Sequence, residues 1–229
     1  VESGEIKKED IGQVLKEKKK SLIEATQDKR DLFKQELESK KAEDKAKIDE
    51  MKAILKAKIE SFKDEGKKAK VGSIANNLTE ANAKITERSS ELVNKLETAL
   101  LAIESRSDKA AVSGADVANV RSLITTAESA ISSARTAITE QAGKTYSIEI
   151  KDEATAKDAL KSTRDALKSD VEKMKIKIKS AHEAVKAAAK ALRSINGVNE
   201  MNVSDEKKSE DDSKSSSAPV ESTNSESNN

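Results

Sequence analysis

The chain has 229 residues, of which 37% are charged, 35% are hydrophobic and 1% are aromatic, and its formal net charge is +1 at pH 7. It contains no Cys and a single His, so it has neither a thiol nucleophile nor a pair of His or Cys ligands for a transition metal, and we expect no enzyme and no cofactor. The near-neutral charge and the scarcity of aromatic residues argue against nucleic-acid binding, which needs a concentrated basic face or stacking platforms.

The first predicted helix covers residues from about 9 to 65, because apolar side chains recur there at helical spacing. Its middle, residues 38–47, has only two alanines as apolar residues, but no Gly or Pro interrupts it, so one continuous helix is expected. Such a helix would be roughly 80 Å long. Gly66 and Gly72 then predict a break in the chain.

The second and third helices are predicted over about 73–104 and 115–142. Ser73 is a suitable N-cap for the second helix, and Ser113 with Asp116 forms an imperfect capping box before the third. In both helices the apolar steps alternate between four and three, which is the spacing of a coiled-coil seam. The seam of the second is Ile74, Leu78, Ala81, Ile85, Ser89, Leu92, Leu96, Ala99 and Ile103. The seam of the third is Val117, Val120, Ile124, Ala127, Ile131, Ala134 and Ile138.

An extended connector and a fourth helix are predicted next. Tyr146, Ile148 and Ile150 alternate with polar residues, which indicates a short extended segment with its apolar side against the bundle. The fourth helix, about 155–196, has the seam Leu160, Thr163, Leu167, Val171, Met174, Ile178, Ala181, Val185, Ala188, Leu192 and Ile195. Thr163 interrupts this seam and is expected to bond to a backbone carbonyl one turn back. Gly197 is suited to the left-handed position after a helix.

The composition changes abruptly after Gly197. Ser, Asn and charged residues dominate, and residues 196–229 contain eight acidic and three basic side chains. Such a segment cannot bury enough apolar surface to offset its ordering entropy, so residues 198–229 are predicted to be a disordered tail.

These elements together predict an all-α protein, an elongated antiparallel three- to four-helix bundle with coiled-coil-like seams over residues 1–197. Short connections marked by Gly favour antiparallel neighbours. No stretch approaches 18 consecutive apolar residues, so no segment is expected to span a membrane.

Few side chains stand out as candidate sites. Asn77 and Asn202 lie in the triplets NLT and NVS, which makes them possible glycosylation sites if the protein is secreted. His182 begins the segment HEAVK, in which a zinc-protease motif would require a second His where this chain has Lys186. We therefore predict no catalytic, cofactor-binding or metal-binding residues.

The alanine-punctuated segments AESAISSARTAI (127–138) and AHEAVKAAAKAL (181–192), the lack of Cys and the end SSSAPVESTNSESNN (215–229) resemble the alanine-rich surface proteins of trypanosomes. These are the glutamate/alanine-rich protein and its relatives, and the likeness, in architecture and composition, covers most of the chain. It implies a helical bundle on the parasite surface, a coat component held by a C-terminal glycosylphosphatidylinositol (GPI) anchor.

The chain departs from this family in being rich in Lys and Ser. It also shows no hydrophobic anchor signal, a segment that is removed from mature anchored proteins. The helical surface lipoproteins of spirochaetes are a competing likeness, but they would carry an N-terminal Cys where this sequence has Val1.

The expected function is that of a non-enzymatic, extracellular cell-surface protein. Its bundle would act as a coat rod or present its tip to an unidentified protein or glycan ligand. The membrane would be contacted only through the C-terminal tail. Two alternatives stay open: a receptor or adhesin for a host or vector macromolecule, and an intracellular coiled-coil scaffold or lipid-associated protein. The small basic runs at 18–20 and 67–70 allow the lipid contact, and self-association is also open.

Overall fold

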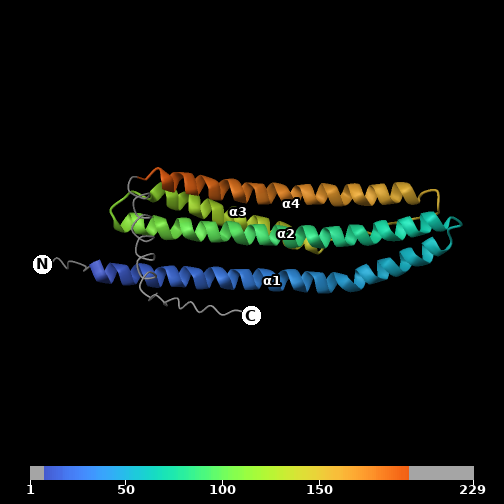
Figure 1. Ribbon diagram of the computed structural model, residues 1–229, viewed down its shortest axis with the longest axis horizontal. Coiled ribbons are helices and arrows are strands. Elements are labelled where there is room, and N and C mark those ends of the chain that lie inside the picture. Colours follow the sequence, from blue (N-terminus) through green and yellow to red (C-terminus); the bar gives the residue numbers. More distant parts are fainter. Residues whose placement is uncertain (1–7, 196–229) are drawn as a thin grey trace, which may run out of the picture.

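The computed structural model describes residues 8–195, which form four helices along a common long axis (Figure 1). The helices are α1 (Lys8–Glu60), α2 (Glu65–Val112), α3 (Ala118–Ala142) and α4 (Ala156–Arg193). The prediction of an all-α helical bundle is confirmed, and no strand occurs between residues 8 and 195. The predicted tail at 198–229 and the helix stop at Gly197 lie outside the described residues.

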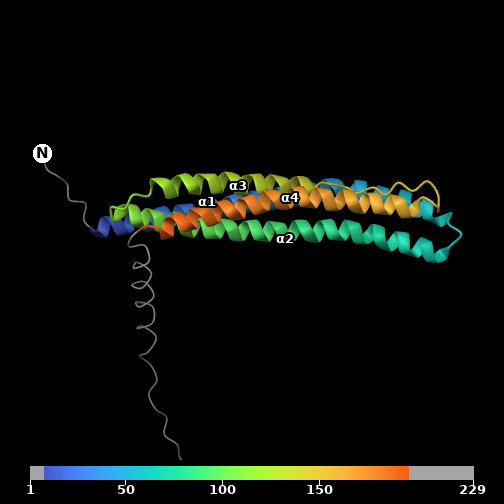
Figure 2. The same ribbon diagram turned by 90° about the horizontal axis from the view of Figure 1, so that it is seen from above.

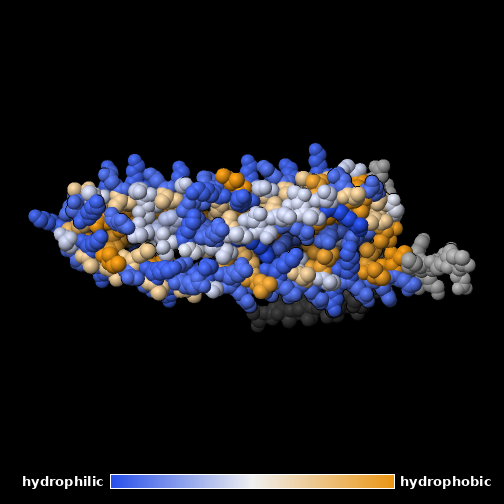
Figure 3. All heavy atoms as spheres, turned by 180° about the vertical axis from the view of Figure 1, so that it is seen from behind, coloured by the Kyte–Doolittle hydropathy of each residue, from blue (hydrophilic) through white to orange (hydrophobic). Residues whose placement is uncertain are grey.

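The four helices form a rod with two distinct ends (Figures 1 and 2). The α1–α2 turn and the start of α4 lie together at one end, which we call the turn end (residues 61–67 and 151–155). The start of α1, the α2–α3 connection and the end of α4 lie at the opposite end, the terminal end. On the face drawn in Figure 3 the surface is mostly hydrophilic, with apolar residues gathered mainly near the two ends.

Helices α2, α3 and α4 each contact the other two, and α1 lies along α2 and part of α3. Within the described part of the chain, the backbone of α1 does not come close to that of α4. With 25 residues, α3 is much shorter than α2 with 48, so the chain continues beyond α3 as an extended connector toward the turn end (Figure 2). The predicted connector is confirmed, and Ile148 and Ile150 are buried against the bundle.

We expect solution scattering of the full chain to report an elongated particle. The 53 residues of α1 span roughly 80 Å, and a uniform rod of that length has a radius of gyration of about 23 Å from its length alone. A compact domain of this chain length would instead have a radius of gyration near 17 Å. A measured value close to that compact figure would contradict the rod.

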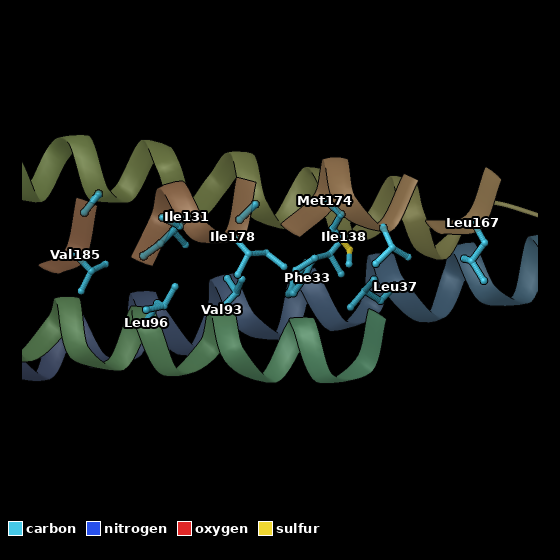
Figure 4. Close-up of a cluster of buried hydrophobic side chains, with 14 of the residues drawn as sticks. Phe33, Leu37, Val93, Leu96, Ile131, Ile138, Leu167, Met174, Ile178 and Val185 are labelled. Atoms are coloured by element: carbon cyan, nitrogen blue, oxygen red, sulfur yellow. The ribbon is translucent and has the colours of Figure 1, made fainter. Parts of the chain in front are cut away.

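Side chains from all four helices meet in one interior (Figure 4). Every residue of the apolar stripe predicted for the third helix is buried, as expected. The seam of α4 is buried too, apart from Leu160 and Ile195, which are half-buried. Thr163 donates its hydroxyl to the carbonyl of Ala159 one turn back at 3.0 Å, as predicted, and is also 3.1 Å from the carbonyl of Ser147.

The seam predicted for α2 is only partly correct. Leu78, Leu96 and Ile103 are buried as expected, but Leu92 is 44% exposed and its neighbour Val93 faces the interior instead. Two polar residues, Asn82 and Thr86, occupy the buried stripe between residues 78 and 93. A search for apolar periodicity passes over such residues, and this shifted the predicted register.

The predicted break between Gly66 and Gly72 is wrong, because α1 ends at Glu60 and α2 already begins at Glu65. The N-cap is Asp64, whose carboxylate accepts the backbone N–H of Lys67 at 3.0 Å. Both glycines therefore lie inside the helix, where Gly costs only about 1 kcal/mol relative to Ala.

Replacing Asp64 with Ala is expected to lower the free energy of unfolding by about 1 kcal/mol, because the Lys67 N–H loses its acceptor at the start of α2. Ser73→Ala is the matched control, since Ser73 is exposed on the helix and caps nothing. Urea unfolding followed by circular dichroism measures both variants. A larger loss of stability from Ser73→Ala than from Asp64→Ala would show that α2 begins at Ser73, as the sequence predicted.

The far end of α2 also differs from prediction, because the helix continues to Val112 rather than ending near residue 104. Gly114 then adopts φ +85°, a left-handed conformation that a residue with a Cβ reaches only at a cost. The N–H of Ala115 reaches the carbonyl of Ala110, and the N–H of Gly114 reaches that of Ala111, each at 3.0 Å. This pattern is the Schellman motif, which closes α2 before the turn into α3.

Candidate functional site

The turn end is a charged surface built from two segments that lie far apart in the sequence. Glu153, just before α4, accepts the backbone N–H of Lys63 at 3.0 Å through Oε2 and pairs with Lys67 Nζ at 2.8 Å through Oε1. The hydrogen bond from Lys67, followed by that from the Lys63 backbone, lowers the pKa of Glu153. One carboxylate thereby ties the α1–α2 turn to the start of α4.

The start of α4 is fixed by a local set of hydrogen bonds. Asp152 Oδ1 accepts the backbone N–H of Thr155 at 2.9 Å, while the Asp152 N–H donates to Thr155 Oγ1 at 3.2 Å. The bond from the Thr155 backbone is the main cause that lowers the pKa of Asp152. These bonds order the start of α4, and the side chains of Lys63, Lys67 and Asp152 stay exposed beside half-buried Glu153. Such a surface can make polar contacts with another molecule.

A second charged cluster fastens α1 between α2 and α3. Glu97 of α2 accepts from Arg30 Nε of α1 at 3.1 Å and from Arg135 Nη2 of α3 at 2.7 Å. Arg135 also donates to the carbonyl of Lys29 at 2.8 Å, and its guanidinium lies 4.8 Å from the centre of the Phe33 ring. The side chains of Glu97 and Arg135 are only 12% and 13% exposed. A single, mostly buried carboxylate thus joins three helices.

Nearer the terminal end, Asp108 of α2 makes a similar junction, with Lys18 of α1 at 2.7 Å and Arg121 of α3 at 3.3 Å. Between the two junctions α1 covers a cavity of about 630 Å³ whose walls include Glu104 and Glu128. Burial, together with the charges of Glu128 and Asp108, raises the pKa of Glu104.

Replacing Glu104 with Gln is expected to stabilise the protein at neutral pH. Because the pKa of Glu104 is raised by folding, its ionised form is disfavoured in the folded state, and the stability it contributes is lost as the pH rises through the folded-state pKa. The gain should therefore be present at pH 7 and disappear below about pH 4, the ordinary Glu range. Urea unfolding at both pH values measures it, with exposed Glu87→Gln as the control; an equal gain at both pH values would contradict the expectation.

A third polar cluster lies where α3 ends, with Asn82 and Gln141 buried and Tyr146 and Asp170 half-buried. The side-chain amide of Gln141 donates to Asn82 Oδ1 at 2.8 Å and to the hydroxyl of Tyr146 at 2.7 Å. Tyr146 in turn donates to Asp170 Oδ2 at 3.3 Å. Gly143, directly after α3, lies so close to α1 that an added Cβ would be 3.2 Å from Asp44 Oδ2. These contacts join all four helices at one level and have the character of a structural junction.

The residues singled out from the sequence do not come together. Asn77 is exposed on α2 beside buried Leu78, which leaves its side chain accessible, and Asn202 lies outside the described residues. His182 is exposed on α4. Among residues 8–195 no three His, Cys, Asp or Glu side chains are grouped as metal ligands. None of the described helices is long and apolar enough to cross a membrane.

Sequence reasoning missed Glu153, Glu97 and Asp108, the three carboxylates that hold the segments together. Their partners lie 13 to 90 residues away in the chain, and 42 acidic side chains offer no local signal that would pick them out.

Comparisons with protein-family models, with curated proteins and with solved structures found no match to this chain.

Proposed function

We propose that the protein is a non-enzymatic, extracellular rod that stands on a cell surface. In this proposal the rod is an antiparallel bundle with coiled-coil-like seams, and residues 198–229 are the stalk that joins it to a membrane anchor. The turn end is then the outermost part of the molecule.

The observation that carries the proposal is the placement of the chain ends. Lys8 begins α1 and Arg193 ends α4 at the same end of the rod, opposite the turn end (Figure 1). A membrane attachment that follows α4 would therefore hold the terminal end near the membrane and carry the turn end away from it by about the length of α1, roughly 80 Å.

The packing of the interior and the ion pairs between helices also favour a structural role over catalysis. The buried apolar residues pack against one another in a single cluster that runs through the helices. The charged groups at helix junctions are engaged in ion pairs that position helices, such as Glu97 with two arginines. Both features are those of a scaffold that presents a surface.

Treatment of intact source cells with a phosphatidylinositol-specific phospholipase tests the membrane attachment. The proposal expects release of the protein into the supernatant, with a known anchored protein of the same cells as the positive control. Retention in the pellet while that control is released, or a gene that stops at Asn229 without a hydrophobic extension, would end the anchor proposal and favour an intracellular scaffold.

A receptor or adhesin is the second candidate, and the fixed charged surface of the turn end favours it. A binding screen of the purified chain against arrays of extracellular proteins and glycans tests this function. The variant Glu153→Gln, which loses the ion pair with Lys67, should weaken any specific hit that uses the turn end. A hit of equal strength with the variant would move the contact elsewhere on the rod, and no hit would favour the coat rod.

A further inference from the structure

The side of the bundle away from α1 carries an open groove between α2 and α4. Because α1 packs on α2 and α3 and its backbone stays away from that of α4, no described helix covers the α2–α4 pair on this side. Two adjoining cavities of about 550 Å³ and 410 Å³ lie along it, and His182 lines both. Together, these two cavities are called the α2–α4 groove.

The floor of the α2–α4 groove is apolar. Leu92, Leu96 and Ile103 contribute from α2, and Ile178, Val185 and Leu192 contribute from α4. Leu92, which has no place in the core, is 44% exposed here. The small side chains of the alanines between these residues leave the groove deep enough for the side chain of another molecule to pack between the two helices.

The edges of the groove are basic. The charged residues that line it, apart from His182, are Arg88, Arg106, Lys175, Lys179, Lys186 and Arg193. No carboxylate is among the lining residues of these two cavities.

Two carboxylates lie near the basic edges of the groove. Glu172 is 3.6 Å from Lys175, and Glu183 is 3.8 Å from Lys179, and all four side chains are well exposed. Exposed pairs of this kind are weak and exchange readily. The groove thus keeps an excess of positive charge on both sides of an apolar floor.

The dimensions of the groove match one helix. Its lining runs from Arg88 to Arg106 on α2 and from Lys175 to Arg193 on α4. Each of these stretches spans roughly 27 Å, which equals the length of an α-helix of about five turns. A helix whose apolar residues recur at i, i+3, i+4 and i+7 would place them on the floor and its flanking residues at the basic edges.

We propose that the α2–α4 groove binds an acidic amphipathic helix of about five turns supplied by a partner protein. The charge of the edges selects acidic flanks, and the apolar floor selects a helix over a polyanionic glycan, which would use the cations alone. The narrow concave shape of the groove fits a single helix better than it fits a flat membrane surface. The groove would bind such a helix whether the protein is extracellular or intracellular.

The probe is a fluorescein-labelled synthetic peptide of about 18 residues, with Leu at the i, i+3, i+4, i+7 positions and Glu and Ala elsewhere. Two control peptides are matched to it: one has Lys in place of Glu, and the other has the same composition with the leucines dispersed around the helix. Fluorescence anisotropy with the full chain at low salt should show binding of the acidic amphipathic peptide and at least tenfold weaker binding of both controls.

Two variants locate the site. Lys175→Glu with Lys179→Glu reverses two charges at one edge, and Lys52→Glu with Lys56→Glu is the matched control on exposed positions of α1. The groove variant should bind the peptide at least tenfold more weakly than the control variant. Leu92→Ser should weaken binding at high and low salt alike, because it removes an apolar contact that salt does not screen. Circular dichroism checks that each variant keeps its helix content.

Four outcomes would overturn the proposal. Equal binding by the groove and control variants would place the peptide elsewhere. Binding that heparin abolishes and that Leu92→Ser leaves unchanged would make the groove a polyanion site. Binding of the chain to phosphatidylserine-containing vesicles that the groove variant loses, with no binding of the peptide, would make it a membrane contact. Failure of the peptide to bind the full chain at low salt also overturns it, whether the groove is unfit or is filled by another part of the chain.

Discussion

Replacement of Ile138 by Ala is expected to lower the free energy of unfolding by about 2–4 kcal/mol. Ile138 lies on α3 in the cluster drawn in Figure 4, and its side chain is 0% exposed. Removing three carbon atoms there deletes their contacts with neighbouring helices and leaves a cavity that a close-packed interior fills only in part. Urea unfolding followed by circular dichroism at 222 nm measures the change.

Ile176→Ala is the matched control for Ile138→Ala. Ile176 is an isoleucine in the middle of α4 whose side chain is 64% exposed, so its truncation should change the free energy of unfolding by less than about 0.5 kcal/mol. Equal effects of the two substitutions would mean that the register of these helices is wrong.

Replacement of Glu97 by Gln is expected to lower the free energy of unfolding by about 2–5 kcal/mol and to release the first half of α1. The change leaves the guanidinium groups of Arg30 and Arg135 close together without their shared carboxylate, and removing one partner of an enclosed ion pair is costly. Between residues 10 and 32 no side chain of α1 is fully buried, so this half of the helix has few apolar contacts to hold it once the ion pairs are lost.

Limited trypsin digestion and hydrogen exchange measure this release. New cleavage among the lysines before Phe33, with faster exchange of the amides there than in α4, is the expected pattern. Glu128→Gln serves as the control, because Glu128 is an exposed carboxylate that lines the same cavity as Glu97. This control should leave the digestion pattern unchanged. If Glu97→Gln lowers stability while α1 stays as protected as before, the ion pairs do not hold the helix.

The parts of the fold that follow from the sequence are those where apolar periodicity is unbroken. In α3 every buried position except Gln141 is Val, Ile or Ala, at steps of three and four, so the period alone identified the inner face. The same holds for α4, where Thr163 was the one polar residue in the pattern. Gly143 marked the end of α3 correctly.

Prediction failed where polar side chains are buried. Asn82 and Thr86 in α2 are satisfied by hydrogen bonds to Gln141 and to the backbone one turn back, and burying them is tolerable only because those partners are present. The partners become visible only in three dimensions. Beyond its predicted end, α2 continues through two more buried polar residues, Ser107 and Asp108. Asp108 is paired with residues of α1 and α3.

The candidate surfaces were still harder to predict than the helices. The sequence indicated a bundle that presents one end, but it gave no means to find Glu153, which acts through Lys63 and Lys67. The α2–α4 groove arises because α1 settles on the opposite side of α2, and the choice between the two sides depends on contacts such as Glu97 with Arg30. Local periodicity carries no information on that choice.

The early end of α3 has a mechanical consequence. Beyond Gly143, toward the turn end, the rod consists of α1, α2, α4 and one extended segment, whereas the other part contains four helices side by side. A beam is most compliant where its cross-section is smallest, so a sideways load on the turn end should bend the rod near the level of Gly143. The polar cluster of Asn82, Gln141 and Tyr146 lies at that level and ties the end of α3 to α2. The cluster thus connects the four-helix part of the rod to the more compliant part. The spread of bend angles in single-particle images of the rod would show whether the rod bends there.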